Sequence, residues 1–148
     1  MSVSLALYQP DMAVNVGAII RLAACFDMDL HIIEPCGFPW VERKIRQSAM
    51  DYYDSSKITK HNDFNAFMVA MQDRRVVLMT TKTSHPYYDF SFKDGDVLLA
   101  GSESAGVPQS VHDAIKHRLT IPIASHTRSL NLGMACAIVS SEALRQIA

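Results

Sequence analysis

Three stretches of the sequence place glycines beside polar or charged side chains, a combination that suits ligand binding and catalysis. The first, residues 15–21, begins with Asn15 and ends with Arg21, and its Gly17 lies where a helix is expected. Glycine inside a helix costs about 1 kcal/mol relative to alanine, so Gly17 predicts a close approach, either by another backbone or by a phosphate. Arg21 lies one helical turn further on, where it could bind an anion or form an ordinary surface ion pair.

The second stretch, residues 98–108, runs from an apolar segment into a loop with Gly101 and Gly106 and reaches Pro108 at the start of a helix. It matches neither the dinucleotide fingerprint GxGxxG nor the phosphate loop GxxxxGK[ST]. A strand–turn–helix corner would explain both glycines, since glycine tolerates positive φ and close contact. It does not explain Glu103, a carboxylate placed directly after a buried strand.

The third stretch, residues 121–135, is a polar segment that leads into the last helix. Ser129 and Asn131 are both competent helix N-caps, which is one explanation for them. The other is that the Asn131 amide and the free backbone N–H groups of the first helical turn bind a ligand. The local pattern leaves both explanations open.

The elements that must position these side chains alternate between strands and helices. This pattern predicts a mostly parallel α/β sheet with helices on both faces, and Asp11 or Asn15 is expected to cap the first helix. Ligands of such sheets bind beyond the carboxyl ends of the strands, where residues 80–82, 101–103 and 122–130 fall. The expected strands are residues 3–8, 30–33, 58–60, 76–79, 97–100 and 119–121, and the expected helices are residues 14–26, 42–50, 63–72, 108–115 and 131–147.

Composition limits the classes of function. Fourteen basic against fifteen acidic side chains give a net charge of -1, so an RNA site would need local clusters of positive charge. We predict RNA contacts at Arg43, Lys44, Arg46, Lys82 and Arg128. The three cysteines have no metal or disulfide spacing, and no signal peptide or membrane span is evident. We therefore expect a cytoplasmic domain over residues 1–148, with no metal, no membrane association and no RNA-binding extension.

Taken together, the three stretches resemble the three motifs of the SpoU (TrmH-type) branch of the SPOUT RNA methyltransferases. The order and spacing of these segments are specific, and the likeness extends over nearly the whole chain. Besides the three stretches, it includes residues 7–10, 31–35, 37–38, 80–82 and 94–96.

The resemblance implies transfer of a methyl group from S-adenosylmethionine to a tRNA ribose 2′-hydroxyl, at the wobble nucleotide. It also implies a C-terminal trefoil knot and a homodimer formed through the knotted region and the first helix. The matched catalytic residues are Arg21, Glu103 and Asn131. The matched cofactor contacts are Met79, Gly101, Ile121 and Ser129, with Leu130 and Ala135 along the adenine pocket.

Two positions depart from the family pattern: Ala105 stands where related sequences carry arginine, and Gly133 replaces a polar residue. Because of Ala105, 2′-O-methylation at another tRNA site or at a ribosomal RNA site is a first alternative function. A non-catalytic RNA-binding module with the same fold is a second alternative, against which the joint presence of Arg21, Glu103 and Asn131 counts. A generic nucleotide-binding oxidoreductase is a third, and the missing GxGxxG after the first strand disfavours it.

Overall fold

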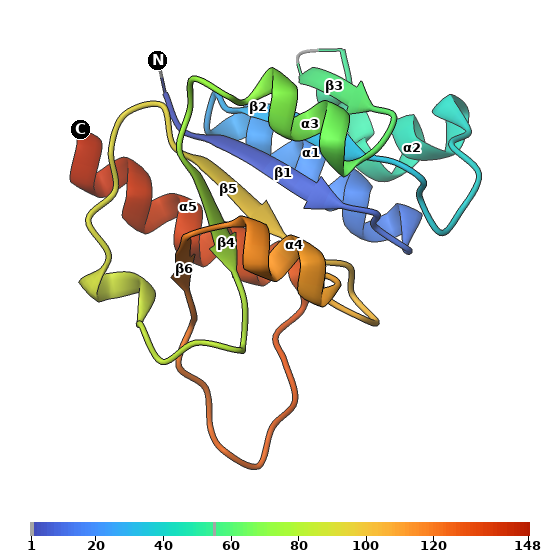
Figure 1. Ribbon diagram of the computed structural model, residues 1–148. Coiled ribbons are helices and arrows are strands. Elements are labelled where there is room, and N and C mark those ends of the chain that lie inside the picture. The colour runs from blue at the N-terminus through green and yellow to red at the C-terminus, as the bar shows by residue number, and fades with distance from the viewer. Residues whose placement is uncertain (1, 55) are drawn as a thin grey trace.

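The computed structural model describes residues 2–54 and 56–148, which form alternating strands and helices in the order expected (Figure 1). Short 3₁₀ turns lie at Met50–Tyr52 and Tyr87–Asp89. The strands are β1 (Ser4–Tyr8), β2 (Asp29–Ile33), β3 (Lys57–His61), β4 (Val76–Met79), β5 (Val97–Ala100) and β6 (His117–Leu119). The α-helices are α1 (Ala13–Cys25), α2 (Glu42–Ala49), α3 (Phe64–Ala70), α4 (Gln109–Ala114) and α5 (Leu132–Ile147).

All six strands belong to one sheet with the order β3-β2-β1-β5-β4-β6, and every neighbouring pair is parallel. This confirms the predicted class of fold. The chain first builds the sheet outward from β1 to β3, then crosses to place β4, β5 and β6 on the other side of β1. The order therefore switches direction between β1 and β5, and a ligand site is expected at the carboxyl ends of these two strands.

Helices cover both faces of the sheet because alternate residues of each strand point to opposite sides. Leu5, Leu7 and Leu98 pack with α1, α2 and α5 on one face. Ala6 and Leu99 pack with α3 and α4 on the other face. Complete burial of such aliphatic side chains contributes about 1.5–3 kcal/mol each, so the two layers hold the central strands, and the loops that follow them, in fixed positions.

The glycine inside α1 is explained by the packing of α2. A methyl group built on Gly17 would lie 2.2 Å from Ser48 Cβ and 2.8 Å from the Ser48 carbonyl carbon. Of the two predicted reasons for Gly17, close approach of another backbone is therefore right and a phosphate is not needed. The contact fixes the start of the segment that carries Met50 and Tyr52, which both touch Arg21.

Two local predictions were wrong. Neither Asp11 nor Asn15 caps α1: its N-cap is Met12, which makes no side-chain cap hydrogen bond. The strand expected at residues 119–121 is β6 at His117–Leu119, because β6 pairs with β4 from His117 onward. By contrast, Asn131 is the N-cap of α5 and accepts a hydrogen bond from Met134 N at 3.2 Å. This confirms helix capping, one of the two roles that the sequence left open for Asn131.

Segments far apart in sequence meet beside the carboxyl edge of the sheet. Residues 80–86 follow β4, and Tyr87 N donates a hydrogen bond to Thr120 O at 2.8 Å just after β6. From Thr120 the chain runs through a long loop to α5, below the sheet in Figure 1. The trefoil knot in this region stays a prediction. None of the helices in the described ranges has both the length and the apolar character needed to span a bilayer.

A buried pair of histidines links β2 to the edge strand β3. His31 Nδ1 lies 2.9 Å from His61 Nε2, and both rings pack edge-on against Phe67 of α3. His31 Nε2 is buried without a hydrogen-bond partner. Burial, together with the nearby His61, lowers the pKa of His31 from 6.5 to about 4, and burial also lowers the pKa of His61. The pair is therefore neutral at pH 7.

This pair predicts that the free energy of unfolding decreases as the pH falls below about 6.5. The unfolded chain takes up a proton on His31 near pH 6.5, whereas the folded chain does so only near pH 4. Between these values the unfolded state binds more protons, so acid favours it, by about 2–3 kcal/mol once pH 4 is reached. Urea unfolding at pH 7.0 and 4.5 measures the difference. His31→Asn, which cannot titrate, should flatten the pH dependence, while His126→Gln in an exposed loop should leave it unchanged; an unaltered slope in His31→Asn would contradict the assignment.

Candidate active site

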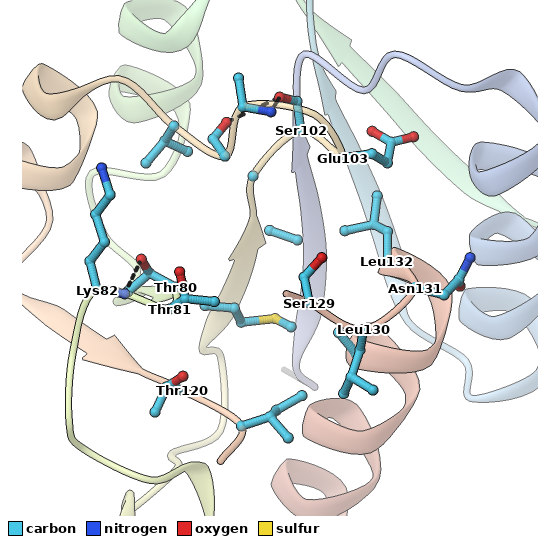
Figure 2. Close-up of a pocket in the computed structure, with 18 of the residues that line it drawn as sticks. Thr80, Thr81, Lys82, Ser102, Glu103, Thr120, Ser129, Leu130, Asn131 and Leu132 are labelled. Carbon is cyan, nitrogen blue, oxygen red and sulfur yellow. Dashed lines mark hydrogen bonds between the residues drawn. The ribbon is translucent and has the colours of Figure 1, made fainter. Parts of the chain in front are cut away.

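A cavity of about 580 Å³ opens at the carboxyl ends of β4, β5 and β6 (Figure 2). Its walls come from the segments after these three strands and from the starts of α1 and α5. Because the strands are parallel, their carboxyl ends meet at one edge, which brings together residues more than a hundred positions apart. The cavity thus joins the three stretches that the sequence singled out.

The structure brings most of the predicted site residues together. All six predicted cofactor contacts line the cavity, with two of the three predicted catalytic side chains and one predicted RNA contact. These are Met79, Gly101, Ile121, Ser129, Leu130 and Ala135, then Glu103 and Asn131, and finally Lys82.

The loop after β5 is closed by a reciprocal pair of backbone hydrogen bonds. Ser102 N donates to Gly106 O, and Gly106 N donates to Ser102 O, both at 2.9 Å. Gly106 adopts φ +65°, and a methyl group on Gly101 would lie 2.6 Å from the Gly106 carbonyl carbon. The two glycines are therefore required by this tight closure, which directs Glu103 toward the start of α1.

Glu103 is held by two donors near the start of α1. Asp11 N donates to Glu103 Oε1 at 3.1 Å, and the Asn15 amide donates to Oε2 at 3.1 Å. The Asn131 amide in turn donates to Asn15 Oδ1 at 3.3 Å. Asn15 thus links the two predicted catalytic side chains from the second and third stretches, and we did not predict it as a site residue. Its signal was a polar residue within an apolar helical stripe.

A second contact fastens the loop after β1 to the loop after β5. The Ser104 hydroxyl donates to the Asp11 carboxylate, and this hydrogen bond lowers the pKa of Asp11. The Asp11 Cα also lies against Gly37, where a methyl group would come within 2.9 Å of it. Asp11 is therefore a structural clamp between loops and stays ionised near neutral pH.

Burial makes the two cysteines of this region, Cys36 and Cys136, poor candidates for nucleophiles. Burial raises the pKa of Cys36 to about 11 and that of Cys136 to about 12, so both are neutral thiols at pH 7, and the thiolate is the reactive form. Within residues 2–54 and 56–148, no three His, Cys, Asp or Glu side chains are grouped to hold a metal ion.

Arg21 and the remaining predicted RNA contacts do not line the cavity. Arg21 is exposed on α1, with its guanidinium 3.3 Å from Met50 Sδ and 5.3 Å from the Tyr52 ring centre. Arg43, Lys44 and Arg46 are exposed on α2, and Arg128 is exposed in the loop before α5. Arg46 binds Glu42 and Asp54 and lies over the Tyr53 ring.

Sequence reasoning also missed His112 of α4, which lines the cavity and whose Nε2 is buried without a hydrogen-bond partner. No spacing or motif in the sequence singles it out, because its exposure to the cavity depends on where α4 packs.

The fold and the site are those of an RNA methyltransferase. Residues 2–141 match the model of the SpoU rRNA Methylase family, and the chain belongs to this family. A tRNA (cytidine(34)-2'-O)-methyltransferase of Beijerinckia indica subsp. indica is 48% identical over 145 residues, 97% of this chain and 91% of the relative.

Solved structures agree with this assignment. One, described as "Structural insights into the 2-OH methylation of C/U34 on tRNA", has a TM-score of 0.93 at 35% identity and covers 98% of this chain and 95% of its own. The SpoU methyltransferase AviRb of Streptomyces viridochromogenes in complex with AdoMet has a TM-score of 0.88 at 22% identity, over 98% of this chain and 60% of that one. The latter likeness shows the shared fold.

Proposed function

We propose that this protein transfers the methyl group of S-adenosylmethionine to the ribose 2′-hydroxyl of the wobble nucleotide, position 34, of tRNA. One observation carries the proposal: a single cavity joins Met79, Gly101 and Ser129 to Glu103 and Asn131. Relatives that are curated as tRNA (cytidine(34)-2'-O)-methyltransferases, and of which this chain covers nine-tenths, support the choice of nucleotide. We place the enzyme in the cytoplasm as a single domain.

The cavity residues suit an adenosyl group. Met79, Ile121, Leu130 and Ala135 offer apolar contacts for an adenine ring, while the closed loop after Gly101 leaves room for a ribose to approach the backbone. The bound donor supplies an activated methyl group on a sulfonium. The task left to the protein is to hold the 2′-oxygen in line with that methyl group, and positioning of this kind lowers a barrier by several kcal/mol.

Arg21 would act on the ribose rather than on the donor. A guanidinium stays protonated in proteins and offers hydrogen-bond donors alone, so it is unsuited to accept the 2′-hydroxyl proton. We assign it to orient the 2′-oxygen or the adjacent phosphate and to stabilise the negative charge that develops there. A phosphate oxygen of the RNA could then accept the proton. Asn131 and Glu103 form part of the cavity wall that would face the methyl donor.

The proposed enzyme acts as a homodimer through α1 and the C-terminal region. Exposed apolar side chains support this: Val14 of α1 is 61% exposed and Met134 of α5 is 64% exposed, on two helices that pack against each other. Large apolar groups left in water on adjacent helices favour association with another protein surface. Arg43, Lys44, Arg46 and Arg128 would then contact the tRNA backbone.

Methylation of a different RNA nucleotide is the alternative within the same class. Ala105 favours it, because this exposed residue lines the cavity at a position where the family pattern that the sequence resembles has an arginine. The deciding experiment incubates the purified protein with labelled S-adenosylmethionine and total tRNA or ribosomal RNA, followed by nucleoside mapping. We expect 2′-O-methylation at tRNA position 34; label in ribosomal RNA or at another tRNA position supports the alternative, and no label overturns both.

Replacing Asn15 with aspartate should lower methyl transfer about 10- to 100-fold at pH 8. Repulsion between the new carboxylate and that of Glu103 would replace the present 3.1 Å hydrogen bond, because both side chains would then carry oxygen atoms that accept and do not donate. The variant keeps the acceptor for Asn131, so a second hydrogen bond can persist. Asn15 is a positioning residue, and its loss acts through Glu103.

The pH profile distinguishes positioning from simple loss of stability. In Asn15→Asp, protonation of one carboxyl restores a hydrogen bond, so relative activity should rise between pH 8 and pH 6. The matched control is Asn65→Asp, an exposed change of the same kind on α3, which should keep the wild-type profile. An Asn15→Asp enzyme with a parallel profile and full activity would show that the link between Glu103 and Asn131 is dispensable.

A further inference from the structure

Two charged side chains of opposite sign lie among the described residues that line the cavity. Glu103 and Asn131 are on one side, and Lys82 lies on the opposite side, beyond Thr80 and Thr81 (Figure 2). No ion-pair partner within the described part of the chain neutralises Lys82, whereas Glu103 is already bound by Asp11 N and Asn15. The cavity is therefore negative at one end and positive at the other.

The backbone around Lys82 is fixed by its neighbours. Thr80 N donates to Leu119 O at 2.9 Å, which continues the pairing of β4 with β6. Lys82 N donates to Thr80 Oγ1 at 3.1 Å, and this bond turns the chain just after the strand. These two hydrogen bonds fix the backbone of Lys82 at the wall of the cavity, and its side chain is exposed.

An unpaired buried nitrogen lies behind the wall of the same cavity. His112 is 8% exposed, and its Nε2 is buried and has no hydrogen-bond partner. Buried polar atoms are nearly always paired, and leaving one unpaired costs about 1–3 kcal/mol. His112 lines the cavity, but this nitrogen has no exposed surface, so a ligand group would reach it only after a movement of the ring.

We infer that the Lys82 end of the cavity is the subsite for the α-carboxylate of the methyl donor, bound by the Lys82 ammonium. This inference rests on the proposed function. The donor carries a positive sulfonium and a negative carboxylate, and the charges of the cavity match that order: the sulfonium lies toward Glu103 and the carboxylate lies away from it. The Thr80 and Thr81 hydroxyls accept hydrogen bonds from the neighbouring α-ammonium group.

The subsite reassigns Lys82, which the sequence pattern placed among the RNA contacts. The other residues of that group, Arg43, Lys44, Arg46 and Arg128, all lie outside the cavity. A role in donor binding predicts that loss of the lysine charge affects ligands with a carboxylate and leaves those without one unaffected.

The test is a binding cycle with two ligands and two proteins. Calorimetry measures the Kd of S-adenosylhomocysteine and of its decarboxylated analogue, which keeps the amine, for the wild-type protein and for Lys82→Gln. We expect Lys82→Gln to raise the Kd of S-adenosylhomocysteine about three- to tenfold, as for the loss of a partly exposed ion pair. The Kd of the decarboxylated analogue should change by less than about twofold or should decrease. Lys93→Gln, an exposed lysine at the other end of β5, serves as the control for loss of one positive charge and should change neither Kd.

Each other outcome is informative. Equal weakening of both ligands by Lys82→Gln would mean a general disturbance of the loop and would overturn the inference. Unchanged Kd values for both ligands, with a weaker Kd for tRNA, would make Lys82 a contact to an RNA phosphate and would also overturn it. If the folded wild-type protein binds neither ligand, the proposed function itself fails, which is a separate result.

Discussion

Replacing Gly101 with alanine is expected to weaken the binding of S-adenosylhomocysteine at least 100-fold. The added methyl group would lie 2.6 Å from the carbonyl carbon of Gly106 and 2.7 Å from its Cα. These are backbone atoms held by the paired hydrogen bonds between Ser102 and Gly106, so no side chain can rotate away. The loop must therefore open, which displaces Glu103, and the added methyl group occupies space through which the donor approaches the loop.

Gly106→Ala is the matched comparison, because it adds the same methyl group to the other member of the pair. Nothing lies within 4 Å of that methyl group, and its cost is the strain of φ +65° alone, about 1–2 kcal/mol. Calorimetry with S-adenosylhomocysteine and thermal unfolding of both variants separate binding from stability. A Gly101→Ala protein that binds within threefold of wild type would show that the closed loop is not needed for donor binding.

The sequence was sufficient to predict the strands and helices of this fold and most of the cavity. Buried strands such as 76–79 and 97–100 are apolar and follow turn residues, so their expected bounds agree with β4 and β5. Once the sheet is parallel, its carboxyl edge collects the loops after Met79, Gly101 and Leu119 without further information. The motif resemblance then identified which of their residues line the cavity.

The errors have tertiary causes. Asp11 and Asn15 are both good helix caps in isolation, yet neither caps α1 because each has a stronger partner elsewhere: Asp11 binds Ser104, and Asn15 binds Glu103. The bond from Asn131 to Asn15 spans 116 positions, and no local pattern encodes it. Likewise, residues 119–121 were expected to form a strand, but Ile121 lines the cavity and the ladder uses His117 and Arg118 instead.

The position of Arg21 leads to a prediction about how two chains share one site. Arg21 lies six residues beyond Asn15, about 9 Å further along the helix, and it contacts Met50 and Tyr52 rather than the cavity. A residue that acts on the ribose must nevertheless reach the donor methyl group. In the proposed homodimer, α1 of one protomer would supply Arg21 to the cavity of the other.

Arg21→Ala should therefore lower kcat about 100- to 1000-fold and leave the Kd of S-adenosylhomocysteine unchanged, because Arg21 does not line the cavity that binds it. Single-turnover methyl transfer and calorimetry measure the two quantities. Arg21→Lys keeps the charge without the planar guanidinium; near-full turnover in this variant would contradict a guanidinium-specific role.

Mixed dimers decide which chain contributes the arginine. Differently tagged Arg21→Ala and Gly101→Ala chains are produced together and the heterodimer is isolated. If Arg21 acts across the interface, the chain with Arg21→Ala keeps an intact cavity and receives Arg21 from its partner, so one of the two sites works and the heterodimer has about half the wild-type activity per dimer. If Arg21 acts within its own chain, one site lacks the arginine, the other cannot bind the donor, and the heterodimer is as inactive as either homodimer. The two arrangements thus differ by about two orders of magnitude in one measurement, and wild-type chains carrying the same two tags control for the effect of the tags.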